Sequence, residues 1–184
     1  NISSPAARSK DVKDLADTMN EAIHIATTGR PGAVLVDMRT DIFAAKTKDE
    51  PDAKIHLAGY QPNVEGHPMQ VKKLLKALES AKKPVIFIGG GVKVSKGATE
   101  ELIKFAHTVN VPVVSSFMGL SGYPADDKQW IGWLGMHGNY ASNMAVTESD
   151  FIIAIGTRFT DRSTGRLDRF AKNYFLKKSA SAIK

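Results

Sequence analysis

The spacing of apolar residues changes several times along the chain, and each change predicts a helix or a strand. From Asp11 the apolar residues recur every three or four positions, which is typical of an amphipathic helix, and Gly29 followed by Pro31 predicts its end. The segment from Ala33 to Asp37 is apolar without alternation and predicts a fully buried strand. Residues 1–10 are polar, so we expect them to be frayed.

The same pattern repeats after residue 67. Pro68 suits the first turn of a helix with an aliphatic inner face, and a second helix is predicted from about Ala98 to Val109. The predicted strands are Val85 to Ile88, Val111 to Ser116 and Phe151 to Ile155, with a short apolar segment from Trp130 to Leu134 and a short helix that opens at Asn139. Helices that alternate with buried strands predict an α/β fold, a Rossmann-like doubly wound parallel sheet.

A segment without sustained periodicity separates these two regions. Residues 44–67 carry mixed charge with several prolines and glycines, which indicates a linker. We expect the strand from Ala33 to Asp37, separated from its sheet, to be an orphan strand with unpaired edges. We expect it to be mobile, docked on the core or paired with another copy of the chain.

Composition and charge exclude several classes of function. With 184 residues, 42% of them hydrophobic, the chain can bury one good core. The net charge is +6, but the lysines are spread over helix faces and loops, which argues against nucleic-acid binding. The longest apolar runs fall far short of the roughly 20 residues of a membrane span. Cysteine is absent and the five histidines lack ligand spacing, so we expect no thiolate chemistry and no metal site.

Glycine-rich turns follow two of the predicted strands. Gly89-Gly90-Gly91 comes after Val85 to Ile88, and Gly156-Thr157-Arg158 comes after Phe151 to Ile155. Open α/β sheets bind ligands at the carboxyl ends of their strands, so the backbone here could approach a phosphate or ribose and Arg158 could fork onto a diphosphate. The alternatives are a permissive strand-to-helix turn for the glycines and a surface ion pair with Asp161 or Asp168 for Arg158.

Two histidines receive different interpretations. His137 lies between two glycines just before the helix that opens at Asn139, which favours a hydrogen bond to a ligand over acid–base chemistry, because no carboxylate partner is evident. His107 lies near a helix carboxyl end and is expected to cap carbonyl groups. The pair Asp126-Asp127 is interpreted as loop solvation, and the segment from Asp161 to Gly165 as a polar loop.

Several short stretches are more specific than generic nucleotide binding. They are Gly29 to Asp37, the strand with Gly89-Gly90-Gly91, Met118-Gly119-Leu120, Leu134 to Gly138, Asn143 to Val146, and the block from Arg158 to Gly165. On these residues, the chain from about 11 to 171 resembles the large catalytic subunit of acetolactate synthase, also called acetohydroxyacid synthase, a thiamine-diphosphate enzyme. The Met-His-Gly segment with the Arg-Phe block is the more specific sign of the biosynthetic, flavin-containing members.

The resemblance implies a division of the chain and a set of cofactor contacts. Residues 1–45 would be the C-terminal remnant of the pyrimidine-binding domain, 46–67 a linker, 68–171 the central FAD-binding domain and 172–184 an irregular tail. In this family the central domain holds FAD, which has no net redox role in the carboligation. Carried over by position, the FAD contacts would be Arg30, Gly89, Gly90, Gly91, Ser116, Phe117, Met118, Gly135, Met136, His137, Gly156, Thr157, Arg158 and Arg162.

The chain also departs from the family pattern. Arg39-Thr40 stands where members usually have Pro-Lys, and Thr160 replaces a common aspartate. The acidic strand expected at the adenosine side of FAD is not recognisable in Asn173 to Lys184, so we expect an incomplete FAD site. The activating glutamate and the segment that holds magnesium and the diphosphate are also not found. We therefore expect this chain to bind neither thiamine diphosphate nor Mg²⁺, to hold no catalytic residue and to be inactive alone.

The resemblance further implies a parent protein that joins pyruvate, after its decarboxylation, to a second 2-oxo acid in branched-chain amino-acid biosynthesis. We expect a homodimer or tetramer, with a regulatory subunit as a further candidate partner. We also expect a cytoplasmic location in a bacterium, or an organelle matrix in a eukaryote. Two alternatives stay open: a standalone Rossmann-like module that binds NAD without chemistry, and another thiamine-diphosphate carboligase or decarboxylase.

Overall fold

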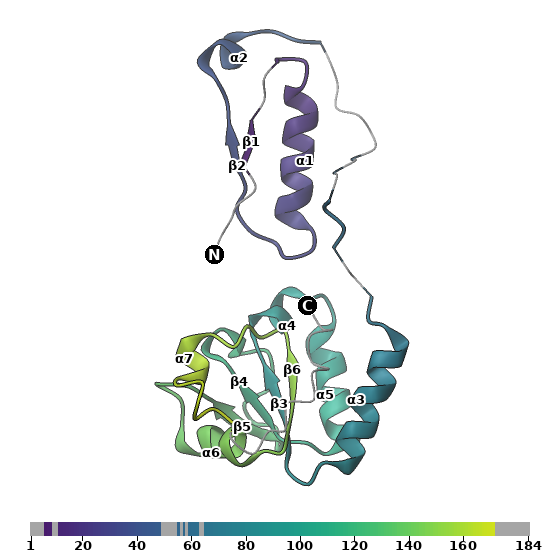
Figure 1. Cartoon of the computed structure of the whole chain (residues 1–184), viewed down its shortest axis with the longest axis vertical. Helices are drawn as coiled ribbons and strands as arrows, with labels where there is room; N and C mark the ends of the chain where they lie inside the picture. Colours follow the sequence, from purple (N-terminus) through teal and green to yellow (C-terminus); the bar gives the residue numbers. More distant parts are fainter. Residues whose placement is uncertain are drawn as a thin grey trace. The chain divides into compact units, whose positions relative to one another are not determined.

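The chain divides into two compact units. The computed structural model describes residues 6–8, 11–48, 55, 57, 59–62 and 65–171. Unit 1 comprises residues 1–65 and unit 2 residues 66–184 (Figure 1). The tail predicted at 172–184 lies outside the described residues, and the assignment of these regions to enzyme domains stays a prediction.

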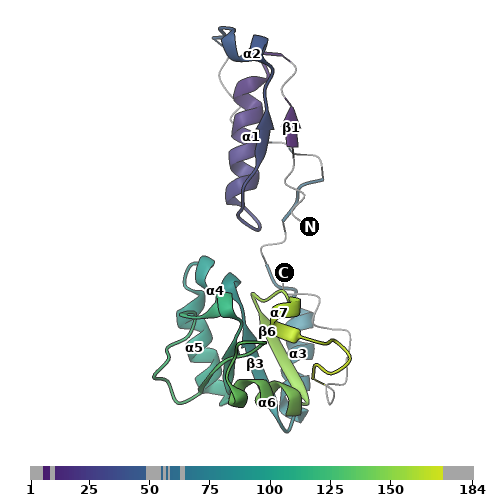
Figure 2. The ribbon, with the colours of Figure 1, turned by 90° about the vertical axis from the view of Figure 1, so that its left-hand side faces the viewer.

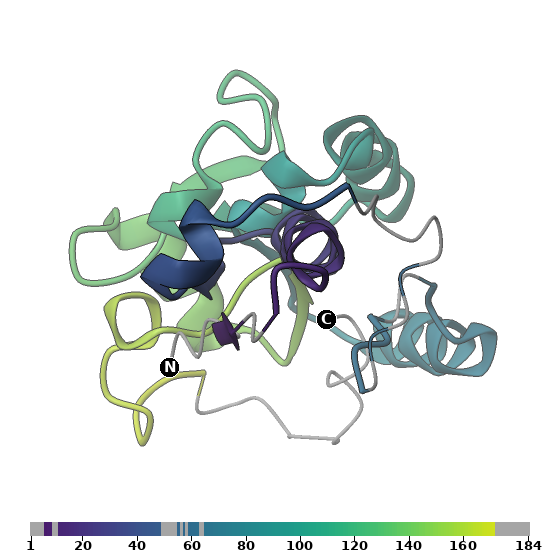
Figure 3. The same cartoon turned by 90° about the horizontal axis from the view of Figure 1, so that it is seen from above.

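Unit 1 is built around a β-α-β segment. Strand β1 (Ala6–Arg8) leads into helix α1 (Leu15–Thr27), and strand β2 (Leu35–Asp37) and helix α2 (Thr40–Ala44) follow. The two strands pair in parallel, with Ala6 opposite Leu35. Helix α1 lies beside β2 in Figure 2 and is seen nearly end-on in Figure 3. Parallel neighbours require such a crossover between them.

Three expectations for unit 1 are wrong. Residues 6–8 form strand β1 instead of fraying, because β2 offers their backbone a partner that the Ala-Ala-Arg pattern does not reveal. Strand β2 is accordingly paired within the chain, and it is not fully buried, since Leu35 is 63% exposed. The helix end at Gly29 is confirmed: α1 stops at Thr27, and Gly29 has a φ of +58° that favours glycine.

Part of the predicted linker is anchored on unit 1. The Tyr60 hydroxyl donates to Thr28 O at 3.0 Å and lies 2.9 Å from Thr28 Oγ1. Its ring meets the ring of His24 edge to face, with the centroids 5.9 Å apart. These contacts hold Tyr60 against the end of α1.

Unit 2 contains a sheet of four parallel strands in the order β5-β4-β3-β6. The predicted α/β fold with a parallel sheet is therefore confirmed. Its elements in chain order are α3 (Pro68–Ser80), β3 (Pro84–Ile88), α4 (Gly90–Val94), α5 (Ala98–Val109), β4 (Val113–Ser115), the 3-10 turn η1 (Phe117–Gly119), β5 (Trp130–Trp133), α6 (Tyr140–Glu148), β6 (Phe151–Ile155) and α7 (Asp161–Thr164).

Side chains that alternate along β3 build two cores. Ile86 and Ile88 contribute to the core that α3 and α5 cover, whereas Val85 and Phe87 contribute to the core on the face of α6. Figures 1 and 3 show α3 and α5 on one side of the sheet and α7 on the other. Because β3 is buried on both faces, its sequence is continuously apolar instead of alternating.

Three short elements of unit 2 differ from the sequence expectation. The segment at Trp130 is a sheet strand, β5; helix α4 begins directly at Gly90; and α7 replaces the polar loop expected after Asp161. Each has at most five residues, which is too short for a hydrophobic period to be recognised. None of the described helices has both the length and the apolar character needed to cross a membrane.

Candidate functional site

The order of the strands creates a switch point between β3 and β6. The chain passes from β3 to β4 and β5 on one side, and then returns to place β6 on the other side of β3. In open α/β sheets a crevice forms outside the carboxyl ends of two such strands, and ligands bind there. Gly89 to Gly91 follows β3 and Gly156 to Arg158 follows β6, so the structure brings both predicted loops to this switch point.

The glycines of these two loops pack against each other. Gly91 N donates to Gly156 O at 3.0 Å, and a Cβ on Gly91 would lie 2.7 Å from Gly156 Cα. A Cβ on Gly89 would lie 2.5 Å from Thr157 Cα. Gly156 itself has a φ of +61°, which favours glycine. The close approach of the two backbones thus accounts for these three glycines without any ligand.

The end of β4 adds exposed apolar side chains to the same edge. Ser116 N donates to Ile88 O at 2.8 Å, and Ser116 Oγ accepts from Gly119 N at 3.2 Å, which closes η1. Within η1, Phe117 is 63% exposed and Met118 is 66% exposed. A Cβ on Gly90 would lie 3.3 Å from Met118 O, so this turn neighbours the first glycine loop.

The loop after β5 is tied to α7. Met136 N donates to Arg162 O at 3.1 Å, and a Cβ on Gly135 would collide with the same carbonyl oxygen. Met136 and His137 are both exposed. The predicted contacts on the β5 loop and on α7 are therefore neighbours in the fold, although their ligand roles stay predictions.

The guanidinium groups of Arg158 and Arg162 are exposed. The two carboxylates considered as alternative partners of Arg158 bind elsewhere: Asp168 pairs with Arg166 at 2.8 Å, and Asp161 Oδ1 accepts from Arg162 N at 2.9 Å. Within the part of the chain that the structure describes, no ion pair joins either arginine side chain. Among those residues, neither cation therefore has an ion-pair partner that an anionic ligand would need to displace.

Arg30 belongs to unit 1. It lies in the turn between α1 and β2, and its side chain is exposed. Its proposed contact with a cofactor held by unit 2 stays a prediction.

A polar network at the carboxyl end of α5 was not foreseen. His107 Nε2 lies 2.7 Å from Asp127 Oδ2, while Asp127 Oδ1 accepts from Gln129 N at 2.9 Å and from the Tyr123 hydroxyl at 3.1 Å. His107 therefore pairs with a carboxylate instead of capping carbonyl groups, and Asp127 is a structural acceptor instead of a solvated loop residue. Their separation of 20 positions hides the pairing from any local pattern.

The pKa values in this network follow from its contacts. The Gln129 N–H lowers the pKa of Asp127 most, burial opposes this effect, and the bonds from His107 and Tyr123 lower it further. Burial, together with the neighbouring Asp127, raises the pKa of Tyr123 to about 12. Asp127 is thus stabilised as a carboxylate and Tyr123 as a neutral phenol.

The network predicts a loss of stability in acid. A carboxyl with a lower pKa in the folded chain stabilises the fold above its unfolded pKa, and this contribution is lost as the pH falls through the folded pKa. We expect the free energy of unfolding to drop below about pH 4, and to drop less in Asp127→Asn, as measured by urea unfolding at a series of pH values. Asp126→Asn, at the exposed neighbouring carboxylate, is the control. Identical acid profiles for wild type and Asp127→Asn would contradict the prediction.

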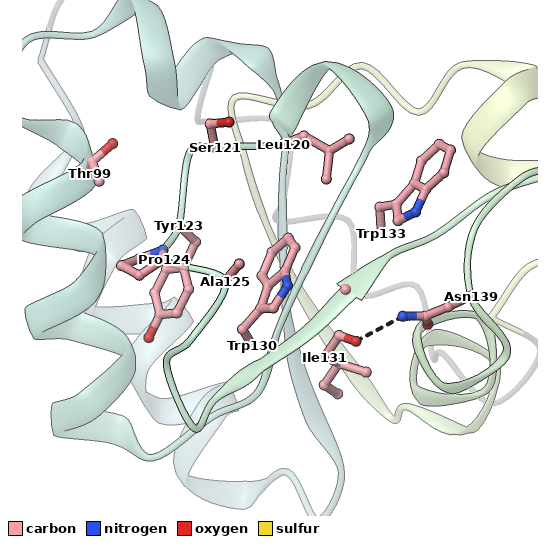
Figure 4. A pocket seen from close by; sticks show the side chains of 11 residues that line it. Thr99, Leu120, Ser121, Tyr123, Pro124, Ala125, Trp130, Ile131, Trp133 and Asn139 are labelled. Carbon is pink, nitrogen blue, oxygen red and sulfur yellow. Dashed lines mark hydrogen bonds between the residues drawn. The ribbon is translucent and has the colours of Figure 1, made fainter.

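A groove of about 770 Å³ lies along the outer edge of β5 (Figure 4). Tyr123 and Trp130 stack beside it with ring centroids 6.2 Å apart, and Asn139 Nδ2 donates to Ile131 O at 2.9 Å. The Asn139 bond occupies a backbone acceptor of this edge strand, which limits pairing with another strand. The residues that line the groove include none of the predicted FAD contacts, but the ring of Trp133, which lines it, lies with its centroid 5.2 Å from that of Phe117, so the groove adjoins the candidate site.

Comparison with known proteins gives a family match over most of unit 2. The family model described as thiamine pyrophosphate enzyme, central domain, matches residues 71–179. The acetolactate synthase large subunit of Haemophilus influenzae is 46% identical over 166 residues, which cover 89% of this chain and 29% of the relative. The probable acetolactate synthase large subunit of Methanocaldococcus jannaschii is 44% identical over 88% of this chain and 28% of its own length. The isozyme 3 large subunit of Escherichia coli is 39% identical over 89% and 29%. The chain spans less than a third of these relatives.

Proposed function

This chain belongs to the thiamine pyrophosphate enzyme central-domain family and is homologous to acetolactate synthase large subunits, and on that basis we propose that unit 2 holds FAD within such a subunit. The observation that carries the proposal is the meeting of four loops at one edge of the sheet, those after β3, β4, β5 and β6. These loops contain most of the residues that the resemblance assigns to FAD.

The chemistry of this edge fits a flavin dinucleotide. Phe117, Met118 and Met136 expose apolar side chains that could cover a planar ring system. Arg158 and Arg162 could offer guanidinium forks to the diphosphate. Gly89 and Gly91 would not contact FAD themselves, because the backbone of the loop after β6 occupies the space where their side chains would be. Their role would be to let that loop pack closely and so to hold it in place.

The rest of the reaction would be carried out by other parts of the parent enzyme. That enzyme would condense pyruvate with a second 2-oxo acid after decarboxylation, in branched-chain amino-acid biosynthesis. Thiamine diphosphate and Mg²⁺ would supply the carboligation chemistry outside this chain, and FAD would take no net redox part. Unit 1 would correspond to the end of the pyrimidine-binding domain, with residues 46–67 as the linker. A cytoplasmic homodimer or tetramer, with a regulatory subunit as a further partner, is the expected assembly.

Titration of the purified chain with FAD and with NAD tests this proposal. We expect saturable binding of FAD, with an affinity at least about tenfold higher than that for NAD, measured by quenching of flavin fluorescence and by calorimetry. Stronger binding of NAD would favour the standalone module, and binding of neither would contradict a nucleotide role. In the same preparation, pyruvate with thiamine diphosphate and Mg²⁺ should not be consumed. Turnover would show that the chain contains catalytic parts that the proposal places elsewhere.

A further inference from the structure

The predicted contacts Met136 and His137 form the corner of a tight turn. Gly138 N donates to Gly135 O at 3.0 Å, so residues 135–138 close a turn with these two side chains at its centre. Gly135 has a φ of +116°, which favours glycine. An interaction that holds the backbone of Gly135 in this conformation therefore also sets the orientation of the Met136 and His137 side chains.

Asn143 of α6 bonds to Gly135 through its whole carboxamide. Its Oδ1 accepts from Gly135 N at 3.0 Å, and its Nδ2 donates to Gly135 O at 3.2 Å. The same Nδ2 donates to Asn139 O at 3.0 Å. The half-buried Asn143 side chain thus satisfies both the N–H and the C=O of Gly135. Because Asn143 lies at the start of α6, these bonds connect the 135–138 turn to that helix.

This set of bonds is specific to asparagine. The site requires one acceptor and two donors at the end of a short side chain. Aspartate would keep the acceptor but would set a charge beside two carbonyl oxygens. Leucine has a similar shape and none of the bonds, and glutamine is one methylene longer.

We propose that Asn143 is the positioning residue of the FAD site: by clamping Gly135, it fixes the Gly135–Gly138 turn and the presentation of Met136 and His137. This inference rests on the proposed FAD-binding function. The turn is held from its other side by the bond from Met136 N to Arg162 O, so releasing Gly135 also loosens the contact between the β5 loop and α7.

Two measurements on the 184-residue chain test the inference. In Asn143→Asp we expect the affinity for FAD to fall about tenfold, under conditions where wild type and variant are both fully folded. In Asn143→Leu without FAD, we expect exchange of the Gly135 amide hydrogen, followed by NMR, to be at least about tenfold faster, because its acceptor is gone.

Ser149→Ala is the matched control. The buried Ser149 hydroxyl donates to Val146 O at 2.8 Å at the opposite end of α6, so the variant weakens the same helix without touching the turn. It should leave both FAD affinity and Gly135 exchange unchanged. Equal affinity in wild type and Asn143→Asp, or an equal loss in Ser149→Ala, would overturn the positioning role and leave the FAD proposal standing. Absence of FAD binding in wild type would contradict that proposal, while unchanged Gly135 exchange in Asn143→Leu would overturn the clamp by itself.

Discussion

Replacing Gly89 with alanine is expected to lower the free energy of unfolding of unit 2 by about 3 kcal/mol or more. The new Cβ would lie 2.5 Å from Thr157 Cα and would collide with the carbonyl oxygen of Gly156. Both neighbours are main-chain atoms that cannot rotate away, so the ends of β3 and β6 would have to separate. The bond from Gly89 N to Ile155 O, 2.9 Å long, would be strained or lost with them.

Urea unfolding followed by tryptophan fluorescence measures this loss in unit 2 alone, because both tryptophans of the chain, Trp130 and Trp133, lie in β5. Gly90→Ala is the matched control, since its Cβ would lie 3.3 Å from its nearest neighbour, Met118 O, and should cost less than about 1 kcal/mol. A Gly89→Ala variant as stable as Gly90→Ala would contradict the close packing of the two loops.

Reversing the charge of Arg158 is expected to weaken FAD binding about a hundredfold, or about 2.7 kcal/mol. The variant Arg158→Glu removes a guanidinium fork and sets a carboxylate near the carboxyl ends of β3 and β6, where the diphosphate is proposed to lie. No ion pair of Arg158 is lost within the described residues, so the stability of unit 2 should change little. Affinity is measured by flavin fluorescence at fixed ionic strength.

Arg166→Glu separates a specific contact from a general effect of charge. Arg166 is exposed and pairs with Asp168 at 2.8 Å, so the variant makes the same charge change on a neighbouring stretch of chain. Arg166 is not one of the predicted FAD contacts, and charges at exposed positions are weakened by screening at about 0.15 M salt, so the control should bind FAD nearly as wild type does. A similar loss in both variants would argue against a direct role of Arg158.

Sequence patterns were sufficient for the long periodic elements. The helix predicted from about Ala98 to Val109 has those bounds in the structure, where Gly97 and Asn110 adopt left-handed backbone conformations at its two ends. Strands β3 and β6 were recognisable because both are continuously apolar. Strand β3 lies inside the parallel sheet and is buried on both faces, whereas β6 is an edge strand and is only partly buried. Local composition carries this information, so no knowledge of distant contacts was needed.

The remaining features depend on partners that are distant in sequence. Strand β1 exists because β2 lies beside it, and His107 turns to Asp127 because the loop after η1 returns to α5. For the candidate site, turn residues indicated that the glycine-rich loops follow strands and meet at one edge of the sheet, but not that Gly89 and Gly156 face each other. The carboxamide of Asn143 was likewise part of a recognised motif without a role, since its bonds to Gly135 depend on how α6 is placed after the turn.

During synthesis, β6 is made well after β3, the strand with which it pairs. Strand β3 has a partner on each edge. On one edge Ile86 of β3 lies opposite Val113 of β4, which follows soon in the sequence. On the other edge Pro84 lies opposite Phe151 of β6, which is synthesised much later. Translation proceeds at about 5–20 residues per second, so the edge of the apolar strand β3 that pairs with β6 stays unpaired for several seconds during synthesis. That interval is when the nascent chain most needs protection from wrong strand pairing. The loops after β3 and β6 can pack together only once β6 has been made, so the proposed FAD site could assemble only on a nearly completed unit 2.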